Sequence, residues 1–322
     1  QIAILKGPQA LYFGKNATAG AVTITTNDPG DEFEIIASAS HEFEYKTDTF
    51  EFVVSGPISE NWGARLALYD STMDEGWIEN IAGDTTYTTL DFSNGFAATS
   101  HDNPAPTQKF YPADEKTYGR LTLKGDIGDR TTLKFKASFA DVTMAAATVA
   151  ELFDCYLGDV PHNNAGNVAT PVPSAGECKK DRKTGLNNIP TVPAAAYELT
   201  GQFGGALGET YESKVFTTTL THDFDNSQLI AVLNTHEQNV AWVIDADYGG
   251  ATNIFAGEVN DFENTSLEIK WLSTSEGPLN WVLGGYVQET ERYFAQEVIF
   301  AGAEESAADP TNRYVAYDKV SE

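Results

Sequence analysis

Two cysteines in one loop-like stretch are among the residues here whose type and spacing suggest chemistry. Cys155 and Cys178 lie in a region rich in Gly, Pro and Asn, with no His pair at ligand spacing beside them. Two cysteines alone do not make a zinc site. A disulfide between them would close a surface loop in an oxidising compartment and stabilise the fold by roughly 3 kcal/mol. The alternative is a pair of unpaired thiols.

A second group combines carboxylates with aromatic rings. Trp242, Asp245, Asp247 and Tyr248 fall in one segment that we expect to be a loop, with Glu258 further along. Carboxylate oxygens bind hard cations. The group is therefore a possible contact for a cationic or metal-bearing ligand, or for divalent ions that bridge lipopolysaccharide. The simpler interpretation is a solvated acidic loop.

The patterns that indicate catalysis or cofactor binding do not occur in the sequence. The stretch from Gly7 to Lys15 has glycines and a lysine, but the spacing differs from that of a phosphate-binding loop, and Asn16 stands where Ser or Thr is needed. No G-x-S-x-G, H-E-x-x-H or Cys–His arrangement is present, and the histidines are scattered. We predict a protein that is not an enzyme and has no cofactor or metal site.

Composition excludes further classes. The 322 residues carry a formal net charge of -27, which argues against binding nucleic acid or docking on anionic lipid through basic residues. Mean hydropathy is -0.30, and no apolar run approaches the ~18 residues of a transmembrane helix. A transmembrane β-barrel stays possible, because its strands alternate and its average hydropathy is low.

The elements that would position these residues show a period of two. Leu133, Phe135 and Phe139 fall on one side of a strand, and Lys134 and Lys136 on the other. A lone basic residue facing lipid costs roughly 2–4 kcal/mol at mid-membrane. We therefore expect one group of basic residues to point into a barrel lumen, where they would bind a plug: Arg120, Lys124, Lys134, Lys136 and Lys270.

Connections alternate in length, as in outer-membrane barrels. Short turns rich in Gly, Asp, Asn and Pro are expected at 56–61, 125–129, 223–227 and 275–278. Long loops are expected at 73–115, 144–210, 241–259 and from 292 onward, which gives about nine strands. Aromatic residues near strand ends are expected to form an interfacial girdle. They are Trp62, Tyr69, Tyr118, Trp271 and Trp281.

Residues 1–29 resemble the last segment of the plug domain of TonB-dependent outer-membrane receptors. That segment has a Gly-Pro turn, an aromatic-Gly turn, a small-residue step and a β-branched strand, and here it ends at Asn27-Asp28-Pro29. Residues 62–69 and 74–78 are also similar to the early barrel of that family. The plug signature consists of Lys6, Gly7, Pro8, Gly14, Asn16 and Gly20.

The resemblance implies an all-β fold, an antiparallel transmembrane β-barrel preceded by the end of a plug. Residues 1–30 would end the plug domain, and residues 31–322 would form the N-terminal portion of the barrel with long extracellular loops. Family barrels have 22 strands, so we expect a partial barrel from a longer polypeptide. The segment that contacts TonB would then lie upstream of this chain.

The implied function is TonB-dependent active uptake of a scarce ligand across the bacterial outer membrane. A ferric siderophore is the first expectation, with haem, cobalamin or a saccharide as others. The implied partners are a TonB-type energy-coupling complex and outer-membrane lipid with lipopolysaccharide, and no nucleic acid. A passive porin-type channel and a secreted β-rich adhesin or glycan-binding protein remain as alternatives.

Overall fold

The structure is a computed structural model. It describes residues 2–8, 19–91, 95, 97–146, 162–163, 170–171, 179–191, 195, 197–246, 252, 254–306 and 309–321. Within these residues, no helix has both the length and the apolar character needed to cross a bilayer.

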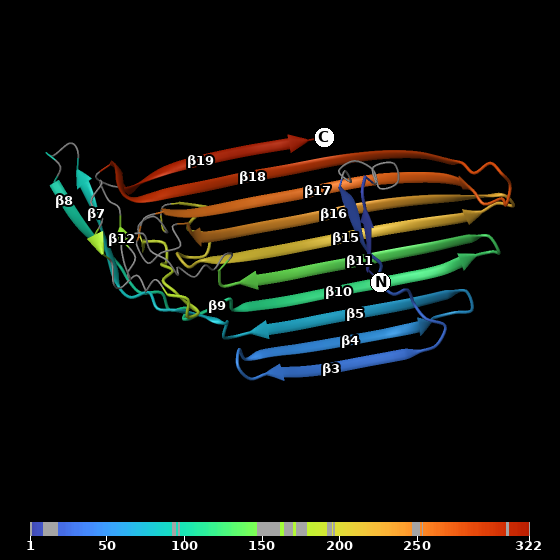
Figure 1. The fold of residues 1–322 in the computed structure, drawn as a ribbon, viewed down its shortest axis with the longest axis horizontal. Coiled ribbons are helices and arrows are strands. Elements are labelled where there is room, and N and C mark those ends of the chain that lie inside the picture. Colours follow the sequence, from blue (N-terminus) through green and yellow to red (C-terminus); the bar gives the residue numbers. More distant parts are fainter. Residues whose placement is uncertain are drawn as a thin grey trace.

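A ten-stranded antiparallel sheet forms most of the described structure (Figure 1). Each strand pairs with its neighbours in chain order, apart from the strands that lie within the long connections. The sequence predicts about nine strands, and the sheet has ten. In order, they are β3 (Glu34–Glu42), β4 (Thr47–Pro57), β5 (Trp62–Met73), β10 (Asp114–Ile127), β11 (Thr131–Met144), β15 (Gly208–Asp223), β16 (Ser227–Asp245), β17 (Ile254–Ser273), β18 (Val282–Ser306) and β19 (Asp309–Ser321).

Smaller sheets accompany the large one. The hairpin of β1 (Ile2–Lys6) and β2 (Gly20–Ile24) lies near the N-terminus, and the others lie in the long connections at one end of the main sheet (Figure 1). The strands in the connections are β6 (Ile78–Asn80), β7 (Thr85–Asp91), β8 (Ala97–Asn103), β9 (Phe110–Tyr111), β12 (His162–Asn163), β13 (Thr170–Pro171) and β14 (Lys183–Thr184).

The connections follow the predicted alternation, with two corrections. Short connections at 58–61, 128–130, 224–226 and 274–281 lie at one end of the sheet, and 74–113 and 145–207 at the other. The four-residue turn at 43–46 is an exception, because it is short and lies at the end of the long connections. The loop predicted at 241–259 shrinks to 246–253, and the loop predicted from 292 onward is strand. The reason is that β16, β17 and β18 keep one unbroken pairing register beyond the stretch with clear alternation.

The two faces of the main sheet differ in chemistry. We call the face that carries Lys134 and Lys136 the inner face, and the face that carries Leu133 the outer face. Outer side chains are apolar and open to the surroundings: Leu283 is 62% and Val287 64% exposed. A soluble core would bury such residues. The outer face includes Ile35, Phe52, Leu66, Leu123, Leu133, Phe135, Leu220, Leu233, Ile269 and Val287.

Acidic residues border this apolar band on the side of the long connections. A row is here a line of directly paired residues on the outer face, and successive rows are two residues apart along each strand. Counted from Asp70 on β5, Asp48 on β4 lies one row nearer the long connections, whereas Glu289 on β18 lies two rows nearer the short turns. The border thus moves about 20 Å along the strands across about 34 Å of sheet, a slope of about 30°. The bordering residues are Asp48, Asp70, Asp141, Glu212, Glu237, Glu263 and Glu289.

The aromatic residues at strand ends divide between the faces. Trp62 and Trp271 lie on the outer face at the short-turn end, and the rings of Trp271 and Trp281 meet edge to face at 5.5 Å. A Cβ at Gly125 would lie 2.1 Å from the Trp62 ring, so this position requires glycine. Tyr69 and Tyr118 lie on the inner face instead, which corrects the predicted girdle. Their positions alternate with those of outward apolar neighbours.

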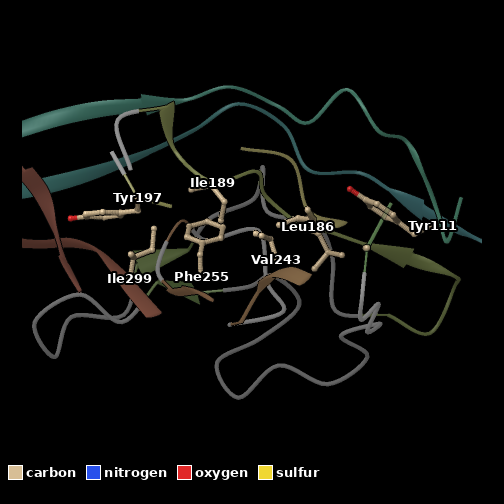
Figure 2. Packing of buried hydrophobic residues seen from close by; sticks show 9 residues of the cluster. Tyr111, Leu186, Ile189, Tyr197, Val243, Phe255 and Ile299 are labelled. Carbon is tan, nitrogen blue, oxygen red and sulfur yellow. The ribbon is translucent and has the colours of Figure 1, made fainter. Parts of the chain in front are cut away.

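The principal buried apolar cluster lies among the connections rather than under the sheet (Figure 2). Val243, Phe255 and Ile299 come from β16, β17 and β18, on the outer face beyond the acidic border. Leu186, Ile189, Tyr197 and Leu207 come from the connection that precedes β15. We call this the loop core, and it comprises Tyr111, Ala146, Leu186, Ile189, Tyr197, Leu207, Val243, Phe255 and Ile299.

Candidate functional site on the inner face

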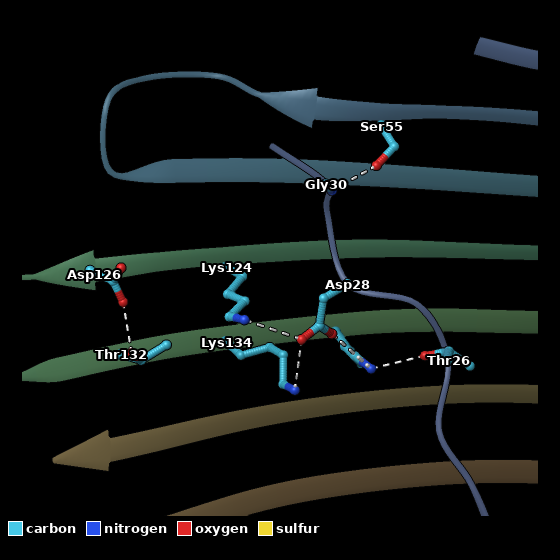
Figure 3. Close-up of polar contacts among 9 residues, drawn as sticks. Thr26, Asp28, Gly30, Ser55, Lys124, Asp126, Thr132 and Lys134 are labelled. Atoms are coloured by element: carbon cyan, nitrogen blue, oxygen red, sulfur yellow. Dashed lines mark hydrogen bonds and ion pairs between the residues drawn. The ribbon is translucent and has the colours of Figure 1, made fainter. Parts of the chain in front are cut away.

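The segment that follows β2 crosses the inner face of the main sheet (Figure 3). Lys136 Nζ donates to Thr26 Oγ1 at 2.9 Å, and the backbone N–H of Gly30 donates to Ser55 Oγ at 3.4 Å. The chain passes so close to β5 that a Cβ at Gly63 would lie 2.8 Å from Pro29 Cβ. We call residues 25–30 the crossing segment.

Asp28 is the centre of this contact. Its Oδ2 lies 3.3 Å from Lys134 Nζ, which donates to it, and 3.5 Å from Lys124 Nζ, while its Oδ1 lies 3.6 Å from Lys136 Nζ. Burial alone would raise the pKa of the Asp28 carboxyl. The charges of Lys134, Lys136 and Lys124, together with the hydrogen bond from Lys134, outweigh it and hold that pKa below its ordinary value.

The sheet register explains why the lysines converge. Lys124 stands directly opposite Lys134, and Thr122 directly opposite Lys136. Like charges opposite each other on one face destabilise a sheet. A carboxylate between them reverses the sign of the interaction, so the crossing segment and the lysines stabilise one another. Arg120 is on the same face of β10, further along the strand. It lines an open pocket of about 490 Å³ together with Tyr69 and Tyr118.

The basic residues predicted to share one side of the sheet lie on the inner face, and three lysines among them contact the N-terminal segment. Lys124, Lys134 and Lys136 bind the N-terminal segment. Lys270 lies 2.7 Å from Glu268 on its own strand. The partner Asp28 was not predicted. Its position between Asn27 and Pro29 gives no local signal for a contact with Lys134, which is 106 positions away.

Four of the plug-signature residues are described, and they surround the base of the first hairpin. Lys6 pairs with Gly20, and Gly7 N donates to Ala19 O at 3.1 Å. Gly7 has a φ of +84°, a conformation that favours glycine, and a Cβ at Gly20 would lie 2.5 Å from Leu5 O. The hairpin therefore depends on both glycines. Pro8 follows Gly7, and Gly14 and Asn16 lie outside the described residues.

The predicted ligand-contacting segment is only partly described. Asp245 ends β16 and is 1% exposed, and its Oδ2 accepts from the backbone N–H of Asn187 at 2.8 Å. The backbone carbonyl of Trp242 accepts from Gln202 Nε2 at 3.2 Å. Both residues thus hold the connection before β15. Asp247 and Tyr248 lie outside the described residues, as do Cys155 and Cys178, so these ligand and disulfide assignments stay predictions.

Buried polar contacts fasten the same connection to the long strands. Glu297 on β18 is 3% exposed, and its Oε2 accepts from Thr200 N at 3.0 Å and from Thr200 Oγ1 at 2.9 Å. Burial raises the pKa of Tyr111 to about 12 in the loop core, and the nearby Asp245 charge adds to the rise. Where the structure describes side chains, no three His, Cys, Asp or Glu residues are grouped as a metal site.

Comparison with known proteins places the fold. No protein-family model matches the sequence, and no curated protein matches it. Among solved structures, the chain is similar to the open form of the ferric-catecholate import receptor Fiu from E. coli K12, with a TM-score of 0.57 and 12% identity over 94% of this chain. It is also similar to the ferric yersiniabactin uptake receptor FyuA from Yersinia pestis, with a TM-score of 0.53 and 10% identity over 99% of this chain.

These likenesses concern the fold. The chain spans 40% of the length of Fiu and 48% of that of FyuA. At such identities the shared feature is the all-β antiparallel sheet, and function has to be argued from the site.

Proposed function

We propose that this chain is part of a TonB-dependent outer-membrane receptor that takes up a scarce ligand. Residues 1–30 would be the end of its plug, and residues 31–322 the first part of its barrel wall. The observation that carries the proposal is the crossing segment on the inner face, with Asp28 bound by three lysines. Porins leave an aqueous channel, whereas large outer-membrane transporters have a plugged lumen, so this contact favours a transporter.

The outer face supports the membrane assignment. Its exposed side chains are apolar in a band, and charges begin along a border that slopes by about 30° relative to the rows. Barrel strands tilt by roughly 35–45° to the membrane normal, so a band parallel to the bilayer has to cross the rows obliquely. A β-rich adhesin in water would have no reason to keep such a band exposed.

A ferric siderophore is the ligand class that we favour, with haem, cobalamin or a saccharide as the other candidates. The names of the similar structures, which are import receptors for ferric siderophores, support this choice, as does the resemblance of residues 1–29 to plug segments. TonB-type energy coupling, outer-membrane lipid and lipopolysaccharide would be the partners.

The test is uptake in the bacterium that makes the full protein. Cells lacking its gene, cells lacking TonB and complemented cells are grown under iron limitation and given a ferric catecholate labelled with radioactive iron. We expect uptake to be lost in both deletion strains and restored on complementation. Solute leakage into liposomes that needs no energy source would favour a porin, and recovery in the soluble fraction an adhesin. Induction by a glycan rather than by low iron would favour a saccharide.

A further inference from the structure

One group of charges on the inner face is not balanced locally. Arg120, Lys124, Lys134 and Lys136 occupy adjoining positions on β10 and β11. Among the residues whose side chains the structure describes, Asp28 is the only carboxylate that forms an ion pair with any of the four, and it pairs with the three lysines. We call the four residues the basic strip. It holds an excess of positive charge in a protein whose formal net charge is -27.

Three other basic residues of the inner face have carboxylates beside them on the sheet. Arg65 lies 3.4 Å from Glu34 on β3, and Lys116 lies 2.7 Å from Asp114 on its own strand. Lys270 has Glu268. These pairs are built into the wall and stay with it. The basic strip differs because its counter-charge is on the crossing segment, which is not part of the main sheet.

If the crossing segment leaves, Lys124 and Lys134 remain opposite each other with no anion between them. Like charges in that arrangement repel, and the repulsion is relieved when any anion of suitable size enters. Two opposed ammonium groups and a third one row along also present several N–H donors to one volume. Such an arrangement suits oxygen atoms of carboxylate or similar anionic groups.

We propose that the basic strip is an anion-binding site of the inner wall, filled by the Asp28 carboxylate at rest and by an anionic ligand after the crossing segment withdraws. The proposal rests on the proposed function, because the exchange requires the plug segment to move. It assigns the ligand class: a chelate or small molecule with net negative charge and oxygen donors on its surface. An interior cationic strip also offsets the repulsion of such a ligand by the acidic exterior.

The test measures the reactivity of lysine amines in the full receptor, with citrate as a probe anion. Wild type and Asp28→Asn are treated with a water-soluble acylating reagent, and modification at each lysine is quantified by mass spectrometry. In Asp28→Asn we expect millimolar citrate to slow modification of Lys124, Lys134 and Lys136 at least fivefold. In wild type, citrate should change these rates less than twofold, because Asp28 already occupies the site. Lys270 is the internal control, and its rate should not respond.

Equal rates with and without citrate at the three lysines of Asp28→Asn would overturn the proposal, and so would equal protection of Lys270. A second variant tests the role in transport. Lys124→Gln with Lys134→Gln and Lys136→Gln should lower uptake of a negatively charged ferric chelate at least fivefold, while binding of the chelate to whole cells is retained. Unchanged uptake in this variant would also overturn it. Absence of TonB-dependent uptake in wild type would refute the proposed function, whereas the citrate result does not depend on uptake.

Discussion

Lys124 and Lys134 face each other directly across β10 and β11, and both Nζ atoms lie within 3.5 Å of the same oxygen of Asp28. The crossing segment and the β10–β11 hairpin, which are far apart in the sequence, thus form one ion-pair cluster. Without the carboxylate the lysine pair opposes sheet formation, and with it the pair anchors the crossing segment.

Replacing Asp28 by Asn should loosen the crossing segment while the sheet stays folded. Hydrogen bonds to charged groups contribute about 1.5–3 kcal/mol, and partial exposure lowers this to about 1 kcal/mol here. Hydrogen exchange of residues 25–30 should therefore become about fivefold faster. Asp31→Asn, three positions on and exposed, is the matched control. An equal increase in that variant would contradict the assignment.

The contact should persist in acid until the pH is well below the ordinary Asp value. The folded pKa of Asp28 lies below 3.8, so the stabilisation is present above that value and is lost as the pH falls through the lowered pKa. Exchange of residues 25–30, corrected for the intrinsic rate at each pH, should be level from pH 7 to about pH 4 and rise only below it. A rise centred at or above pH 5 would show that the carboxylate is not held by the lysines.

Tyr111 should stay un-ionised through the range in which exposed tyrosines titrate. Burial raises its pKa to about 12, so the stabilisation of its neutral form is fully present below pH 10 and declines as the pH rises toward 12. Ultraviolet titration of Tyr111→Phe should match that of wild type below pH 11. A loss of one tyrosine equivalent near pH 10 in the variant would place Tyr111 in water.

Phe255→Ala should open the loop core but leave the sheet intact. Phe255 is fully buried, and deleting such a ring costs about 3–5 kcal/mol. The cost should fall on the connection before β15, because the ladders of the main sheet do not depend on that ring. Trypsin should then cleave faster after Arg182 and Lys183. Phe300→Ala is the control, since Phe300 is 40% exposed, and it should leave the cleavage rate close to that of wild type.

Ala137→Arg should impair assembly into membranes much more than Thr132→Arg. Ala137 lies on the outer face, midway along β11 between Leu133, which shares its register row with Trp62, and Asp141 at the acidic border. A basic side chain on a lipid-facing position costs about 2–4 kcal/mol near the bilayer midplane. Thr132 points to the inner face, where its hydroxyl donates a hydrogen bond to Asp126 Oδ1. The yield of heat-resistant folded protein in the membrane fraction measures the difference. Similar yields for the two variants would mean that the outer face does not meet lipid.

Local patterns were sufficient to predict the strands and the sidedness of the wall. The alternation around Leu133 and Lys134 identifies the faces, and Gly, Asp and Asn at 125–129 and 223–227 identify the turns. The strand after residue 292 was missed because its register continues through Glu297 and Gln296. Both residues pair with β17 and β19. Glu297 also accepts from Thr200 in the connection before β15, and Gln296 donates to Glu258 on β17, which no local window reveals.

The site was harder to predict for the same reason. The inner lysines follow from the alternation, but their partner Asp28 depends on where the crossing segment lies in space. Asp245 looks like part of an acidic loop in the sequence and is buried in the structure, because Asn187 folds back over it from 58 positions away. Contacts between distant segments decided both outcomes.

The connections at the two ends of the main sheet differ greatly in length. At one end of the sheet the connections at 58–61, 128–130 and 224–226 are short, whereas the other end carries the long connections of residues 74–113 and 145–207. Moving those long connections through an apolar layer would strip water from their peptide groups. A wall of this shape could enter such a layer in one direction only. The difference in connection size would then determine the orientation of the protein without a separate targeting signal.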